Sequence, residues 1–187
     1  MKLTLVDHNP EVVEAWHRHF SSEVTIRQSN FEDITDCIAF ATAGNSFGMM
    51  DGGVDKAVAE FDPGVESVVQ RSIRDQCHGE LLVGQSLLVS MRKGGYEWLL
   101  YTPTMRVPMS IRGTDNVYLA TWAVLNLATA MYLDSVAIPG FGFRTGQVPA
   151  AEVARQMSLA WENFNNVPEK MEWPAIMNRH NRIKDRY

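Results

Sequence analysis

The chain has 187 residues, of which 45% are hydrophobic, and its formal net charge is −5 at pH 7. This length suits one domain, or one domain with a tail, and this share of apolar residues is enough for a single buried core. The negative net charge argues against a broad basic surface for nucleic acid, so any polyanion would have to meet a local site. Phosphate groups remain candidate ligands, because backbone amides bind them without net positive charge.

The cysteines and the start of the chain bear on the compartment. Cys37 and Cys77 lack CxxC spacing, which favours free thiols in a reducing environment. No stretch approaches the roughly 20 apolar residues of a membrane span, and residues 1–7 are too short for a signal peptide. We therefore expect a cytoplasmic protein without a membrane partner.

The histidines do not suggest a metal site. His17 and His19 are two positions apart on a predicted helix, so their side chains point away from each other. The remaining histidines are isolated in the sequence, and we predict surface or capping roles for them: His8, His78 and His180.

The N-terminal half alternates between strand-like and helix-like segments. Asn9-Pro10-Glu11 supplies an N-cap, a proline at the first helical position and an early acid. Residues 37–43 are a nearly continuous run of small apolar residues, as expected of a strand that is covered on both faces. In chain order we predict a strand over 2–7, a helix from Asn9, strands over 23–28 and 37–43, a helix over 54–61 and a helix capped by Asp62-Pro63.

The C-terminal half continues this alternation. Val117, Val124 and Ala128 recur at helical spacing in a long apolar segment. In chain order we predict strands over 86–90 and 97–101, a helix over 115–134, a strand over 135–138 and a helix from Pro149 to Phe164.

Strands that alternate with helices predict a three-layer α/β/α sandwich with a mixed, largely parallel central sheet. In such sheets ligands bind at the carboxyl ends of the strands. We assign this domain to residues 1–165. Residues 166–187 are predicted to form a polar tail that packs on the domain partly through Trp173 and Ile176, and we assign the tail no function.

The most informative stretch is NSFGMMDGGVD, residues 45–55, which joins a predicted strand to a predicted helix. A glycine-containing loop in this place points backbone N–H groups at a phosphate. The loop also carries an amide at Asn45 and a carboxylate at Asp55, so it can position chemistry as well as hold an anion. Two plainer interpretations stay open: Asp55 is a helix-start acid favoured by the helix dipole, and Asn45 is a turn residue that bonds its own backbone.

A second glycine loop, PGFGFRTGQVP, covers residues 139–149 and again joins a strand to a helix. Phe141 and Phe143 interleave with its glycines, and Arg144 and Thr145 supply hydrogen-bond donors. One interpretation is a phosphate-binding loop with an aromatic wall, and the other is a crossover turn with two core phenylalanines. Because both glycine loops follow strands, we expect a pyrophosphate-sized ligand between them.

A third motif, PTMRVP, covers residues 103–108 directly after a predicted strand. The proline at each end fixes the backbone. The sequence leaves open whether Arg106 faces a ligand or solvent.

Together, the three motifs resemble those of the macrodomain, the α/β module that binds ADP-ribose. The resemblance runs from about Val24 to Phe164, and the form of the motifs is similar to a bacterial and phage branch of the family. The family's first loop has an asparagine, a glycine-rich stretch and a Val-Asp pair that opens a helix. The same order is kept here by Asn45, Gly52, Gly53, Val54 and Asp55.

The resemblance implies ADP-ribose as the ligand, with no metal or other cofactor required. By the resemblance, Asn45 would touch the distal ribose and Asp55 matches the acidic position that the hydrolytic members use, so both are candidate catalytic residues. The further residues that the resemblance places at the ligand are Ser46, Asp51, Gly52, Gly53, Val54, Pro103, Thr104, Gly140, Phe141, Gly142, Phe143, Arg144, Thr145 and Gly146.

For the adenine end, the resemblance points to Asp33 and Ile34. They match the family's Asp-Ile pair, whose carboxylate takes the adenine amino group. Because this stretch is shorter than usual, Glu32 and Asp36 are alternatives, and a plain surface acid is another interpretation of Asp33.

Some positions depart from the best-known family pattern. Met50 and Asp51 interrupt the usual glycine run, as is normal for this branch. Thr42 stands where many members carry an asparagine, and Arg144 replaces a glycine. An arginine at this point could pair with the diphosphate and tighten binding. It could also narrow the cleft and exclude a bulky protein-linked substrate.

The resemblance leads to two functional hypotheses. The first is hydrolysis of an ADP-ribosyl bond at C1″, on protein, nucleic acid or ADP-ribose-1″-phosphate. Asn45 and Asp55 would orient the attacking water, and either Asp55 or the ligand's own phosphate would accept its proton. The second is a non-catalytic reader of ADP-ribosylated macromolecules, or a protein that sequesters an NAD-derived metabolite.

Overall fold

The computed structural model describes residues 1–184. In this range, six strands form one sheet in the order β2-β1-β6-β3-β5-β4, and every neighbouring pair is parallel except β4 with β5. The strands are β1 (Lys2–Asp7), β2 (Thr25–Gln28), β3 (Ala39–Asn45), β4 (Leu87–Ser90), β5 (Trp98–Met105) and β6 (Ser135–Ile138). The predicted mixed, largely parallel sheet is confirmed.

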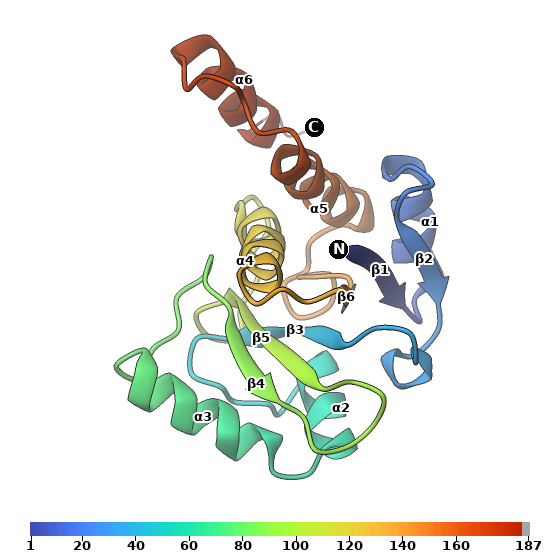
Figure 1. The fold of residues 1–187 in the computed structure, drawn as a ribbon, viewed down its shortest axis with the longest axis vertical. Helices are drawn as coiled ribbons and strands as arrows, with labels where there is room; N and C mark the ends of the chain where they lie inside the picture. The colour runs from blue at the N-terminus through green and yellow to red at the C-terminus, as the bar shows by residue number, and fades with distance from the viewer. Residues whose placement is uncertain (185–187) are drawn as a thin grey trace.

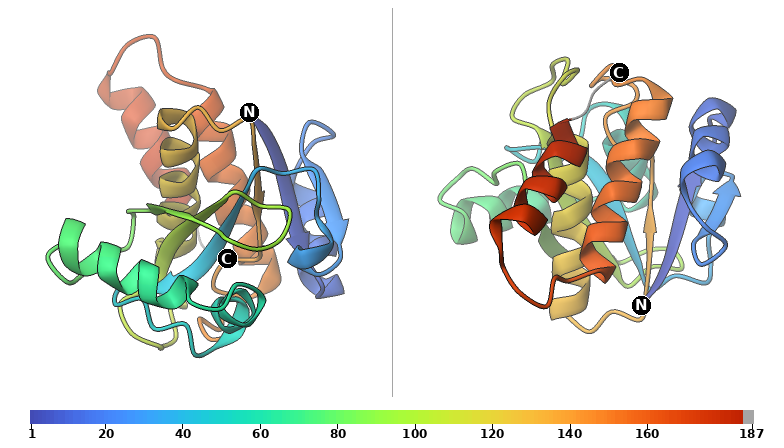
Figure 2. Two further views of the ribbon diagram at one scale, coloured as in Figure 1. Left: turned by 60° about the horizontal axis from the view of Figure 1, so that its bottom comes forward. Right: turned by 90° about the horizontal axis from the view of Figure 1, so that it is seen from above.

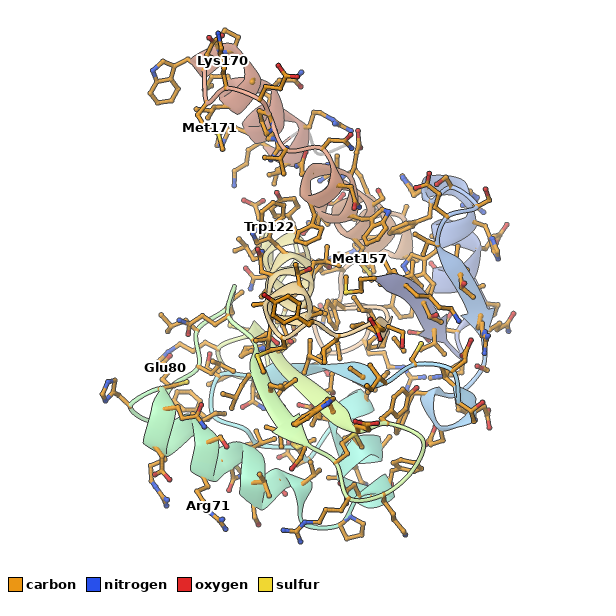
Figure 3. The ribbon with its side chains drawn as sticks, viewed as in Figure 1. Arg71, Glu80, Trp122, Met157, Lys170 and Met171 are labelled. Carbon is orange, nitrogen blue, oxygen red and sulfur yellow. The ribbon has the colours of Figure 1, made fainter. Side chains whose placement is uncertain are left out.

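Helices cover both faces of this sheet (Figures 1 and 2). Helices α1, α4 and α5 pack on one face, and α2 and α3 pack on the other. Trp16 and Met157 belong to the core on the first side, where Met157 lies between α5 and the sheet (Figure 3), and Val58 and Val69 belong to the core on the second side. The helices are α1 (Pro10–His19), α2 (Gly53–Phe61), α3 (Val65–Gln76), α4 (Asn116–Ala130), α5 (Ala150–Asn165) and α6 (Trp173–Lys184), with a 3-10 turn η1 over Phe31–Asp33.

Strand β3 shows why the apolar run in the sequence forms a central strand. Successive side chains of a strand point to opposite faces of the sheet. Phe40 joins the core on the α2–α3 side, and Ala39 and Ala41 join the core on the other side. All three are fully buried, so the prediction of a strand covered on both faces is confirmed.

The parallel pairing brings the carboxyl ends of four strands to one edge of the sheet. β1 pairs with β6, β6 with β3, and β3 with β5, all in the same direction. The loops that leave this edge begin after Asp7, Asn45, Met105 and Ile138. Segments that are far apart in the sequence therefore meet at one place, where a ligand is expected.

The helix start predicted at Asp62-Pro63 is corrected by the structure. Helix α3 begins at Val65, after Gly64, whose φ of +101° is a left-handed conformation that favours glycine. The Asp62 carboxylate accepts the backbone N–H of Arg92 at 2.8 Å. Asp62 therefore ties the turn before α3 to the segment that follows β4.

The C-terminal segment forms helix α6, which lies against α5 on the side away from the sheet (Figure 1). Its attachment is polar: the Arg155 guanidinium donates to the Arg182 carbonyl at 2.7 Å, and Arg182 pairs with Glu162 at 2.6 Å. Trp173 is 74% exposed and Ile176 is partly exposed, so the expectation that the tail packs through Trp173 is wrong. None of the helices in residues 1–184 combines the length and the apolar character that crossing a membrane requires.

Candidate ligand-binding site

A cavity of about 270 Å³ opens at the carboxyl ends of the strands. Its volume lies just below the usual range of ligand pockets, about 300–1,000 Å³. Both glycine loops contribute to its wall, together with the ends of β1 and β5 and the turn η1. The predicted residues that line it are Gly52, Gly53, Val54, Thr104, Gly140, Gly142, Phe143, Arg144, Thr145 and Gly146.

The first glycine loop presents the N-terminus of α2 to this cavity. Gly52 is the N-cap, and residues 52–54 line the wall. Within residues 1–184, the N–H groups of residues 51–55 have no acceptor in the protein. The first N–H groups of a helix point outward along its axis and carry its positive partial charge. This end of the cavity wall is therefore suited to an anion.

Gly52 and Gly53 leave open space above the backbone. A Cβ atom added at either residue would meet nothing within 4 Å. Gly52 has an extended conformation that any residue adopts, with φ −149° and ψ 156°. The fold therefore does not require a glycine at position 52, and what its missing side chain provides is room in the cavity.

The second glycine loop is held by its own turns and leaves a row of N–H groups unpaired. The N–H of Val148 donates to the Gly142 carbonyl at 3.0 Å, and that of Ile111 donates to the Gly146 carbonyl at 2.9 Å. In the described part of the chain, the N–H groups of residues 141–146 donate to no protein acceptor. A Cβ at Gly146 would lie 2.5 Å from the Gly142 carbonyl oxygen, so this glycine is required by the loop itself.

Of the two phenylalanines in this loop, one belongs to the core and the other lines the cavity. Phe141 is fully buried in the core on the side of α1, α4 and α5, and it does not line the cavity. Phe143 is half-buried and lines the cavity. The loop is thus a crossover turn with one core phenylalanine and also a wall with one aromatic ring at the cavity.

Asn45 holds the first loop together. Its Oδ1 accepts the N–H of Phe47 at 3.1 Å and the N–H of Met49 at 3.3 Å, and its Nδ2 donates to the Met49 carbonyl at 2.7 Å. This is the interpretation in which Asn45 bonds its own backbone. Asn45 and Ser46 are buried and do not line the cavity.

Asp55 lies in the first turn of α2 and is 3% exposed. Its Oδ1 accepts the Thr42 hydroxyl, and the Tyr101 hydroxyl lies 3.5 Å from Oδ2. Burial raises the pKa of the Asp55 carboxyl from its ordinary value of 3.8 to about 7, and the bonds from Thr42 and Tyr101 oppose this rise. Asp55 is thus a helix-start acid that also joins α2 to β3 and β5, and it does not line the cavity.

Comparison with known proteins decides the family. Residues 41–157 match the model of the Macro domain family. The chain belongs to the Macro domain family. This stretch contains both glycine loops and the PTMRVP motif, so the family suggested by these motifs is confirmed.

Solved macrodomains share this fold. The macrodomain of Mycobacterium tuberculosis DarG is 18% identical, with a TM-score of 0.60 over 72% of this chain and 88% of that chain. An Oceanobacillus iheyensis macrodomain with ADP is 20% identical, with a TM-score of 0.62 over 74% of this chain and 75% of that chain. An uncharacterized protein of Aeropyrum pernix is 28% identical over 122 residues, which cover 65% of this macrodomain and 62% of the relative.

The acids proposed for the adenine end of this macrodomain occupy different places. Glu32 lines the cavity, whereas Asp33 is exposed outside it. Asp36 accepts bonds from Lys2 and, at 2.8 Å, from Arg27, so it is committed to surface ion pairs. The structure therefore brings Glu32, not Asp33, to the site, in line with the alternative left open by the short segment.

The third motif contributes one residue to the cavity wall. Thr104 lines the cavity, as predicted. Arg106, whose direction the sequence left open, pairs with Glu80 at 2.6 Å, and its guanidinium lies 5.3 Å from the ring centre of Phe47, so it faces the surface. Three other predicted residues do not line the cavity: Ile34 and Pro103, which are buried, and Asp51, which is exposed.

Two polar residues at the end of β1 line the cavity but were not predicted as site residues. Asp7 Oδ2 accepts the N–H of Gly140 at 3.2 Å, which links β1 to the second glycine loop. His8 lies at the cavity wall and bonds Arg144. The sequence could have indicated both residues, because polar residues at the carboxyl end of a parallel strand are candidates for a ligand site.

Gln147 has a left-handed conformation in the second loop, with φ +55°. Such a conformation strains a residue that has a Cβ, by about 1–2 kcal/mol. A glycine would relieve this strain, but its larger conformational entropy in the unfolded chain would offset part of the stabilisation. We expect Gln147→Gly to raise the free energy of unfolding by about 0.5–1 kcal/mol in urea denaturation. Gln147→Ala keeps the strain and should change the stability little; a less stable glycine variant would contradict this prediction.

Proposed function

We propose that this macrodomain binds ADP-ribose in the cavity, with the diphosphate between the two glycine loops. The observation that supports this most is the pair of unpaired N–H rows, at residues 51–55 and 141–146, of which residues 52–54 and 142–146 line one cavity. Fixed N–H groups at a helix N-terminus are a general device for binding phosphate. The O. iheyensis macrodomain with ADP shows that a nucleoside diphosphate binds to this fold in a relative.

The remaining wall suits a nucleoside. Phe31 and Phe143 supply apolar aromatic surface, and the Glu32 carboxylate can accept from the amino group of adenine. The cavity thus combines an apolar part that suits the adenine with a wall of N–H donors that suits the diphosphate in the middle of ADP-ribose. We place the adenine beside Glu32 and the diphosphate between residues 52–54 and 142–146.

Calorimetric titration tests this assignment. ADP-ribose, ADP, AMP, NAD and ATP are compared under one buffer and salt condition. We expect ADP-ribose to bind most tightly and AMP, which lacks the diphosphate, to bind weakly. Tighter binding of AMP or ATP than of ADP-ribose would contradict the assignment.

Hydrolysis of an ADP-ribosyl bond at C1″ is our second candidate. The observation that favours it is an acid, Asp55, whose pKa of about 7 suits general acid–base chemistry and which follows the cavity-lining residues 52–54 directly. Asp55 is buried, and its carboxylate accepts a hydrogen bond from the Thr42 hydroxyl. To act on water it would have to exchange this hydrogen bond for one to the water, and we therefore rank hydrolysis below binding. A role of Asn45 in orienting that water stays a prediction.

Asp55→Asn separates hydrolysis from binding. If Asp55 takes the proton from the attacking water, turnover should fall by about 10²–10⁴, because this is the usual contribution of a general base. The ADP-ribose affinity should stay within about threefold, since Asp55 is not in the cavity wall. The measurement is release of ADP-ribose from modified protein, from modified nucleic acid and from ADP-ribose-1″-phosphate.

Two outcomes would change the assignment. Unchanged turnover in the Asp55→Asn variant would remove Asp55 from the chemistry. No release by the unaltered protein from any of the three substrates, together with tight ADP-ribose binding, would favour the reader or sequestering function.

A further inference from the structure

One side-chain pair crosses the cavity wall and connects β1 to the second glycine loop. The Arg144 guanidinium bonds the Nε2 atom of His8, and both residues line the cavity. Neither is buried, so the pair lies at the cavity's exposed rim. We propose that the Arg144 guanidinium, held in position by His8, binds the diphosphate of ADP-ribose; this rests on the proposed function.

The chemistry of the pair fixes the direction of its hydrogen bond. A guanidinium only donates hydrogen bonds, so the Nε2 atom of His8 accepts the bond from Arg144. The other ring nitrogen, Nδ1, lies 3.8 Å from Oδ1 of the Asp7 carboxylate. The His8 ring thus lies between this carboxylate and the Arg144 guanidinium.

His8 is carried by a rigid part of the site. Asp7 accepts the N–H of Asn9 at 2.9 Å and the N–H of Gly140 at 3.2 Å, so the end of β1 is joined to the start of the second loop. A Cβ at Gly140 would lie 2.9 Å from Asp7 Oδ2, which shows how close these segments are. His8 is thus a fixed point for the side chain that reaches across from the loop.

Arg144 is free to bind an anion. A guanidinium has five N–H donors, and in the described part of the chain His8 is the hydrogen-bond partner of Arg144, with no carboxylate paired to it. Its backbone belongs to the row of unpaired N–H groups at residues 141–146. Arginine binds phosphate in a bidentate manner, and holding it in place beforehand reduces the side-chain entropy lost on binding.

The other charged side chains of the cavity wall are acids, which leaves Arg144 as the side chain that can attract the diphosphate. Glu32 also lines the cavity and is an acid, so it does not attract the diphosphate. Asp7 has both carboxylate oxygens bonded to backbone N–H groups. Arg144 is therefore the permanent positive side-chain charge among the described residues that line the cavity.

The test is calorimetric titration of the full chain with ADP-ribose and with adenosine, which lacks phosphate. Arg144→Gln should weaken ADP-ribose binding by about tenfold or more, the usual effect of a charged hydrogen bond, and change adenosine binding less than about twofold. Arg112→Gln, at an exposed arginine outside the cavity wall, is the matched control and should change neither. Thermal melting confirms that each variant is folded.

The role of His8 is tested through Arg144. His8→Ala should weaken ADP-ribose binding by about threefold, and His8→Gln should restore it, because the glutamine carbonyl can accept from the guanidinium. In the double variant with Arg144→Gln, the His8→Ala change should have no further effect, since coupled residues are not additive.

The outcomes separate this inference from the proposed function. If the unaltered protein does not bind ADP-ribose, both fall. If it binds but Arg144→Gln binds equally well, the Arg144 side chain does not bind the diphosphate, and the proposed function stands. Additive effects of the two substitutions, or no recovery with His8→Gln, would show that His8 does not position Arg144.

Discussion

Gly52→Glu is expected to weaken ADP-ribose binding by at least about 100-fold and to leave the melting temperature nearly unchanged. The extended conformation at Gly52 is open to any residue, and a Cβ there would meet nothing within 4 Å. The added carboxylate would enter the cavity beside the diphosphate. Two like charges about 4 Å apart repel by roughly 4 kcal/mol near a protein surface, which is more than a 100-fold loss.

Two variants control this experiment. Gly52→Ala adds a methyl group without charge and should weaken binding much less than the glutamate. Gly95→Glu places the same charge at an exposed position outside the cavity, where a Cβ would make an ordinary contact at 3.6 Å, and should not change binding. Retained affinity in Gly52→Glu would show that the diphosphate does not lie over the N-terminus of α2.

Most of the fold could be predicted because its signals are local. The apolar run at 37–43 and the cap at Asn9 identify β3 and the start of α1, and the structure confirms both. The N-cap of α1 is the Asn9 side chain, which accepts the N–H of Glu11 at 2.9 Å. The two glycine loops could be placed at a site for the same reason: a loop after a parallel strand lies at the carboxyl edge of the sheet.

The directions of side chains within these loops could not be predicted. Asp55 turns to Thr42 and Tyr101, and Tyr101 is 46 positions away in the sequence. Nothing in the motif NSFGMMDGGVD indicates that a hydroxyl from another strand will donate a hydrogen bond to the Asp55 carboxylate. The motif therefore fixes where the backbone of the loop lies, and tertiary contacts decide which of its side chains reach the cavity.

The contribution of β1 was missed for a topological reason. β1 lies beside β6, although more than 130 residues separate Asp7 from Gly140 in the sequence. An isolated histidine after the first strand therefore favoured a surface role, and only the strand order brings His8 to Arg144. The tail was misjudged for another reason: Trp173 is a large apolar residue, but α6 attaches through arginines instead.

The buried Asp55 should make stability fall as the pH rises from about 4 to about 7. Its pKa is raised from 3.8 to about 7 in the folded protein, chiefly by burial. Between these values the folded state holds a proton that the unfolded chain has lost, so the free energy of unfolding decreases with pH. The contribution is complete below about pH 4, falls by about 1.4 kcal/mol per pH unit and amounts to roughly 4 kcal/mol over this window.

Urea denaturation at several pH values, with Asp55→Asn as the comparison, measures this term. The asparagine does not titrate, so the difference in unfolding free energy between the two proteins isolates Asp55 from the other carboxylates. Asp134→Asn, at an exposed aspartate, is the matched control and should leave the pH dependence unchanged. A difference that stays constant from pH 4 to pH 7 would mean that Asp55 is ionised in the folded protein. An ionised Asp55 could still accept the Thr42 hydroxyl, but it would no longer have the near-neutral pKa on which the proposal of a general base rests.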